Sequence, residues 1–120
     1  MANVLVWVDI PVLDLDRAIG FYSAILAAPV TKQEHPGRII GLLPGSGDEV
    51  TGCLHVSNHE RPSVDGPLIY LGCQGRLDAA IAKVVPGGGK VLMDKHEIAP
   101  YGFRAVVVDS EGNRIALHSV

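Results

Sequence analysis

The segment Leu15-Asp16-Arg17-Ala18-Ile19 returns later in the chain as Leu77-Asp78-Ala79-Ala80-Ile81. The two copies start 62 residues apart (77 minus 15), which is close to half of the 120 residues. A repeat with that period indicates two copies of one supersecondary unit. The sequence therefore predicts a single domain, 1–120, built from a first module at about 1–58 and a second module at about 66–120.

Each repeated segment has the spacing of an amphipathic helix. Apolar residues follow Asp14 at steps of three and four over 15–26, which predicts a helix with Asp14 as its N-cap and Pro29 after its end. A second apolar stripe covers 77–85 and stops at Pro86 and three glycines. These glycines follow a helix instead of opening one, so they predict a helix end and not a phosphate-binding loop.

Apolar, β-branched runs separated by turn residues predict the strands. They are 4–12, 30–34, 38–43 and 49–56 in the first module, and 68–73, 90–95, 103–109 and 114–119 in the second. Each module thus has the order β-α-β-β-β, which is an α+β fold class. Two such modules placed edge to edge are expected to form a curved mixed sheet, a half-barrel, around a cleft, with the helices on the outer face.

Composition excludes several classes of protein. Apolar residues make up 48% and charged residues 19%, which favours a globular core over disordered tails. Ten Lys and Arg against thirteen Asp and Glu leave no basic surplus for nucleic acid or anionic lipid. The apolar run 4–8 is far shorter than the roughly 20 residues of a membrane span, and no secretory signal pattern is present. Cys53 and Cys73 are expected to be reduced core thiols, so we predict a cytoplasmic protein.

Both ends of the chain resemble one superfamily. The residues that carry the resemblance are Val8-Asp9-Ile10-Pro11-Val12, Asp14 to Ile19 and Phe21-Tyr22 near the start, and Tyr101-Gly102-Phe103, Asp109-x-Glu111-Gly112-Asn113-Arg114-Ile115 and Leu117-His118-Ser119 near the end. This pattern resembles the vicinal oxygen chelate superfamily, which includes glyoxalase I, bleomycin resistance proteins and extradiol dioxygenases. The resemblance implies the fold, whereas the superfamily hosts isomerases, dioxygenases, thiol transferases and drug binders.

The resemblance also implies where metal ligands would lie. The matching positions hold Trp7, Leu54, Leu68 and Ala116. None of these side chains binds a divalent cation, and a catalytic zinc site needs about three protein ligands. A shift of one residue in the fourth strand would introduce only His55, a single imidazole. We therefore predict no metal and no cofactor.

Strand alternation extends this set to a cleft wall. Trp7 brings Asp9 to the same face, Leu68 brings Tyr70, and Ala116 brings Arg114 and His118. Tyr101 and His96 fall on a stretch that the resemblance places near the cleft mouth. The predicted ligand-binding residues are Trp7, Asp9, Leu54, Leu68, Tyr70, Tyr101, Ala116 and His118.

Each of these residues also has a structural interpretation. Trp7 is equally consistent with a core or dimer contact, and Tyr70 with a core position. Asp9 is either a solvated or hydrogen-bonded carboxylate or a buried base with a raised pKa. His118 lies close to the end of the chain and is alternatively an exposed side chain.

Three functions compete. The first is a metal-free protein that binds a small apolar or aromatic molecule in the cleft. The second is a lyase- or isomerase-type enzyme that uses acid–base groups, with Asp9 as base and His118 or Tyr101 as acid. The third is a glyoxalase-type metal enzyme in which His55, His59, Glu60 and His96 would have to gather. In each case we expect a homodimer, with its modules either swapped between chains or not.

Overall fold

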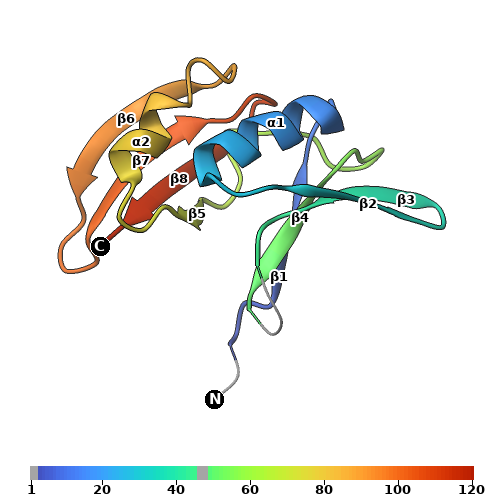
Figure 1. Cartoon of the computed structure of the whole chain (residues 1–120), viewed down its shortest axis with the longest axis horizontal. Coiled ribbons are helices and arrows are strands. Elements are labelled where there is room, and N and C mark those ends of the chain that lie inside the picture. The colour runs from blue at the N-terminus through green and yellow to red at the C-terminus, as the bar shows by residue number, and fades with distance from the viewer. Residues whose placement is uncertain (1–2, 46–48) are drawn as a thin grey trace.

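The computed structural model describes residues 3–45 and 49–120, and its elements form two successive β-α-β-β-β modules (Figure 1). The first module contains β1 (Trp7–Pro11), α1 (Leu15–Leu26), β2 (Thr31–His35), β3 (Arg38–Leu42) and β4 (Thr51–His55). The second contains β5 (Ile69–Gly72), α2 (Leu77–Ala82), β6 (Lys90–Glu97), β7 (Phe103–Val108) and β8 (Arg114–Ser119). The predicted α+β fold class with two modules is therefore confirmed.

The described strands form two separate four-stranded sheets with the same topology. The strand orders are β1-β4-β3-β2 and β5-β8-β7-β6. In each sheet the first strand is parallel to its neighbour, and the remaining pairs are antiparallel. β1 and β5 are consequently edge strands of their sheets, and this position matters for the site described below.

The first strand is shorter than the sequence predicts. The apolar run begins at Val4, whereas β1 begins at Trp7. Val4, Leu5 and Val6 are 88%, 77% and 71% exposed. Strand propensity alone does not make a strand, because a strand also needs a partner for its backbone groups.

Helix α1 has the bounds and the N-cap that the sequence predicts. The Asp14 Oδ1 atom accepts a hydrogen bond of 3.0 Å from the Arg17 amide. At the other end, the Arg76 guanidinium of the second module donates to the Ile25 carbonyl at 2.7 Å. The two ends of α1 are therefore held by different parts of the chain.

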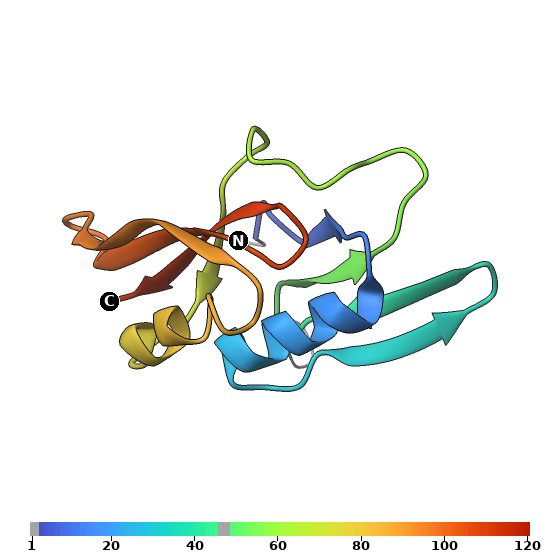
Figure 2. The ribbon, with the colours of Figure 1, turned by 90° about the horizontal axis from the view of Figure 1, so that it is seen from above.

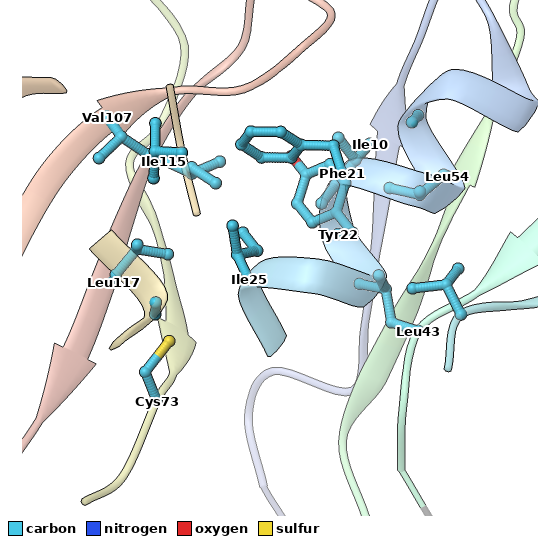
Figure 3. Close-up of a cluster of buried hydrophobic side chains, with 14 of the residues drawn as sticks. Ile10, Phe21, Tyr22, Ile25, Leu43, Leu54, Cys73, Val107, Ile115 and Leu117 are labelled. Carbon is cyan, nitrogen blue, oxygen red and sulfur yellow. The ribbon is translucent and has the colours of Figure 1, made fainter. Parts of the chain in front are cut away.

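The buried face of α1 lies between the two sheets. Figure 3 shows Phe21, Tyr22 and Ile25 between side chains of both modules. Those side chains are Ile10, Leu43 and Leu54 of the first module and Cys73, Val107, Ile115 and Leu117 of the second. All of them belong to one hydrophobic cluster, so the two modules share a core.

A turn of the second module, residues 109–113, joins the two modules through buried carboxylates. The Glu111 side chain accepts the amides of Leu13 and Asp14 at 2.9 and 2.8 Å. It also accepts two hydrogen bonds from the Arg17 guanidinium, at 2.7 and 2.9 Å. Burial favours the protonated acid most strongly, but these donors together outweigh it and lower the pKa of Glu111 to about 2.

Asp109 gives this turn its shape. Its Oδ1 atom accepts the amides of Glu111, Gly112 and Asn113 at 2.8 to 2.9 Å. Its Oδ2 atom accepts the Tyr22 hydroxyl of α1 at 2.5 Å. Asn113 in turn donates to the Pro11 carbonyl at 2.8 Å. The acidic turn is thus a structural joint between the modules.

The connection between the modules, residues 56–68, runs along the side of the molecule opposite both helices (Figure 2). It contacts the same turn, because the Ser63 amide donates to Asn113 Oδ1 at 3.2 Å. No helix among the residues described is long and apolar enough to cross a bilayer.

Candidate functional site

A groove of about 760 Å³ lies between the edge strands β1 and β5. Its size is within the range of roughly 300–1,000 Å³ that is typical of small-molecule sites. The described residues that line it are Leu5, Trp7, Val8, Asp9, Leu26, Leu43, Pro44, Val50, Thr51 and 67–72. Four of the residues predicted from the sequence are among them, namely Trp7, Asp9, Leu68 and Tyr70.

On the β1 side, Asp9 fixes the orientation of Trp7. The indole Nε1 donates to Asp9 Oδ1 at 2.8 Å, and the same oxygen accepts Cys53 Sγ at 3.2 Å. The Arg38 guanidinium lies 3.3 Å from it. The hydrogen bond from Trp7 is the main cause that lowers the pKa of Asp9, and it outweighs the partial burial that opposes it. The structure therefore contradicts the interpretation of Asp9 as a buried base with a raised pKa.

Cys53 belongs to the same cluster but is not an activated thiol. Its side chain is buried, and burial is the main cause that raises its pKa to about 11; the nearby Asp9 carboxylate adds to the effect. A reactive cysteine needs the opposite shift, toward the thiolate. Cys53 therefore serves as a hydrogen-bond donor to Asp9.

On the β5 side, Tyr70 is held by Arg104. The Arg104 Nη1 atom donates to the Tyr70 hydroxyl at 2.5 Å, and Arg104 Nε donates to His96 Nε2 at 3.0 Å. The rings of Tyr70 and His118 meet edge to face, with their centroids 6.2 Å apart. A polar cluster of Tyr70, His96, Arg104 and His118 therefore lies on the second sheet beside the groove.

The predicted position of Leu54 was wrong by one residue. β4 pairs with β1 so that Asp9 is opposite Cys53 and Ile10 is opposite Leu54. Leu54 is fully buried in the core with Ile10, on the face that α1 covers. Strand alternation fixes the period of two but not its phase, and the wrong phase exchanges the two faces.

Three further predicted residues fall outside the described lining of the groove. Ala116 lies opposite Tyr70 in the register but is fully buried. His118 and Tyr101 contact each other, with 2.6 Å between His118 Nε2 and the Tyr101 carbonyl oxygen. The Tyr101 side chain is 71% exposed in the turn between β6 and β7. We therefore do not keep Tyr101 and Ala116 in the site.

The residues at the positions implied for a metal do not fit one. Trp7, Leu68 and Ala116 offer no metal donor, and Leu54 is in the core. Within 3–45 and 49–120 no three His, Cys, Asp or Glu side chains form a group suited to a metal ion. The proposed gathering of His55, His59, Glu60 and His96 is thus not seen, and His96 instead bonds Arg104 on the second sheet. The absence of a cofactor stays a prediction.

The sequence did not predict Arg104 or Arg38 as parts of the site. It placed His96 near the cleft mouth but did not include it among the ligand-binding residues. The available signal was the pairing of strands, since β7 places Arg104 directly opposite His118 on β8. The sequence alone does not give that register. Arg114, which strand alternation placed on the cleft wall with Ala116, instead donates to the Gly66 carbonyl at 2.9 Å.

Comparison with solved structures defines the class of fold. A glyoxalase/bleomycin resistance protein from Albidiferax ferrireducens superimposes with a TM-score of 0.75 at 19% identity, over 98% of this chain and 99% of that one. A trypanothione-dependent glyoxalase I from Leishmania major gives a TM-score of 0.65 at 19% identity, over 98% and 87%. A fosfomycin resistance protein from Listeria monocytogenes gives 0.67 at 12% identity, over 100% and 93%.

These likenesses show that the chain has the fold of the vicinal oxygen chelate proteins, as its sequence resemblance implied. No family model matches the sequence, and no curated protein matches it. At these identities the likeness concerns the fold, and the activity has to be argued from the site.

Proposed function

We propose that this protein binds a small apolar or aromatic molecule in the groove between β1 and β5. The observation that carries the proposal is the placement of Trp7 and Tyr70 on one groove, each about half exposed, at 46% and 45%. Aromatic rings with accessible faces and fixed orientations provide large apolar contact area at a low entropic cost. Asp9 fixes the first ring and Arg104 the second.

The alternative is an acid–base enzyme of the glyoxalase group. It is supported by the fold and by the presence of Asp9 in the groove. It is weakened by the lowered pKa of Asp9, since a general base works best with a pKa near the working pH. His118, the candidate acid, already bonds the Tyr101 carbonyl. We therefore favour binding over catalysis.

The proposal includes a homodimer in the cytoplasm. The apolar side chains of Val4 and Val6 are exposed and lie outside the described lining of the groove, so they offer a surface that a second copy would cover. Two free thiols suit a reducing compartment. Light scattering should give about twice the chain mass of 12.7 kDa, and a mass of one chain would contradict the dimer.

The binding proposal is tested with N-phenyl-1-naphthylamine, an uncharged aromatic probe that fluoresces in apolar sites. Trp7 is the only tryptophan, so energy transfer from it to the probe reports binding to the protein, and the two variants below assign that binding to the groove. The variant Tyr70→Ala should weaken binding about fivefold or more, because it removes one aromatic contact. Tyr101→Ala, which removes an exposed ring outside the groove, is the matched control and should bind as the wild type does. No transfer from Trp7, or equal effects of the two variants, would refute the proposal.

A further inference from the structure

Resting on the proposed function, we infer that the molecule bound in the groove carries an anionic group, such as a carboxylate, sulfonate or phosphate, and that Arg104 binds this group. The inference comes from two features that lie side by side: the aromatic wall of the groove, and a guanidinium that is held in place but pairs with no carboxylate of residues 3–45 and 49–120. It names the chemical class of the ligand, which the groove alone leaves open.

The register of the second sheet places Arg104 in a basic row that reaches the groove. Across the four strands this row is Gly72, His118, Arg104 and His96. The neighbouring row is Tyr70, Ala116, Val106 and Met93. Gly72 and Tyr70, the first member of each row, both line the groove. One sheet face therefore presents an apolar row and a basic row side by side.

The partners of Arg104 leave its charge unbalanced. Arg17 and Arg38 pair with the carboxylates of Glu111 and Asp9. The partners that the described structure gives Arg104 are instead a phenol and an imidazole.

The imidazole of His96 supplies no negative charge to Arg104. His96 Nε2 accepts from Arg104, and its Nδ1 lies 2.9 Å from the Asp94 carbonyl oxygen. A histidine ring carries either no charge or a positive one, so it does not balance a guanidinium. Neither partner of Arg104 therefore supplies a negative charge.

Arg104 retains donors for a ligand. A guanidinium has five N–H groups, and the bonds to Tyr70 and His96 use two, which leaves three. Its planar fork matches the oxygens of a carboxylate, sulfonate or phosphate. Because Tyr70 and His96 already hold the side chain, little side-chain entropy remains to be lost on binding. An anion there lies next to the Tyr70 ring, so the rest of the ligand extends into the groove.

The test compares two probes with the same aromatic body. 8-Anilinonaphthalene-1-sulfonate is N-phenyl-1-naphthylamine with a sulfonate added. The wild-type protein should bind the sulfonate probe at least about tenfold more tightly than the uncharged probe, as expected for one charge-assisted hydrogen-bonded contact. The readout is the ratio of the two affinities: in Arg104→Gln it should fall to about one, because any loss of Tyr70 positioning weakens both probes equally. Arg61→Gln, in the exposed connection between the modules, is the matched control and should keep the preference.

The outcomes separate the two proposals. If both probes bind equally to the wild type, or if Arg104→Gln keeps the preference, the anion site is refuted and the groove proposal stands. If the uncharged probe does not bind the wild type, both proposals fall. Should Arg104→Gln not fold, sulfate competition on the wild type decides: sulfate should displace the sulfonate probe and not the uncharged probe. Equal displacement, or displacement of neither probe, would refute the anion site.

Discussion

Glu111 is the residue whose contacts hold the two modules together most directly. Its side chain is fully buried, and its donors all belong to or adjoin the start of α1, apart from the neighbouring Ser110. A carboxylate in this position stabilises the joint only while it is ionised and hydrogen-bonded.

We predict that Glu111→Gln lowers the free energy of unfolding by about 2 kcal/mol at pH 7, because an amide replaces a charged acceptor of several hydrogen bonds. Urea unfolding followed by circular dichroism measures the change. Asp78→Asn is the matched control: it removes the exposed pair with Lys95, which is worth less than about 0.5 kcal/mol. Equal losses in the two variants would contradict the role of Glu111.

The pH dependence of stability should carry the signature of the same group. The folded pKa of Glu111 is about 2, below the usual value of 4.5, so its contribution is complete above about pH 4.5. It is lost as the pH falls from 4.5 toward 2, because the unfolded chain takes up the proton first. The difference in unfolding free energy between wild type and Glu111→Gln should therefore shrink over that interval. A difference that stays constant from pH 6 to pH 2.5 would contradict this assignment.

At the scale of single elements, α1 packs closely against the second module because Gly87 and Gly89 leave space for the Phe21 ring. A Cβ on Gly89 would lie 2.9 Å from the Phe21 ring and 2.3 Å from the Val108 carbonyl oxygen. Helix α2 ends at Ala82 and not at residue 85 as predicted, so the glycine run lies beyond the helix end, where it allows close packing.

We predict that Gly89→Ala destabilises the protein by about 2 kcal/mol or more, since neither the Val108 backbone nor the buried ring can move freely. Gly20→Ala is the matched control in the exposed part of α1, where a Cβ meets nothing within 4 Å. It should stabilise the protein by about 0.5–1 kcal/mol through helix propensity. Thermal unfolding of both variants checks the opposite signs, and a stabilising Gly89→Ala would refute the packing argument.

Elements were predictable to the extent that a local pattern determines them. The bounds of α1 followed from the spacing of its apolar residues and from Asp14, because both signals lie within the helix. The phase of β4 did not, because it depends on the pairing of β4 with β1, which brings Gly52 so close to Val8 that a Cβ would lie 2.3 Å from the Val8 carbonyl oxygen. Arg104 was missed for a similar reason, since its neighbours come from strand pairing over long sequence distances.

The whole molecule has one core although it has two sheets. Ile25 and its neighbours on α1 contact both modules, so neither sheet keeps its packing when the other is lost. The sequence predicted the two modules from the repeat, whereas the sharing of a single helix face depends on three-dimensional packing.

We predict a single cooperative unfolding transition. Trp7 fluorescence reports on the first module, and the rate of Cys73 labelling reports on the second, where this thiol is buried. The two probes should give the same urea midpoint. Ile25→Ala should lower both midpoints together, corresponding to a loss of about 2–4 kcal/mol. Separate midpoints would show that the modules unfold independently.

The two walls of the groove belong to different modules, so its width depends on the contacts between the modules, which include those of the 109–113 turn with α1 and the residues before it. A substitution at Glu111 or Asp109 should therefore lower the affinity of the groove for its ligand, although neither residue lines the groove. Conversely, a ligand that binds only the folded protein between β1 and β5 raises the free energy of unfolding by mass action. Binding in the groove should therefore raise the melting temperature.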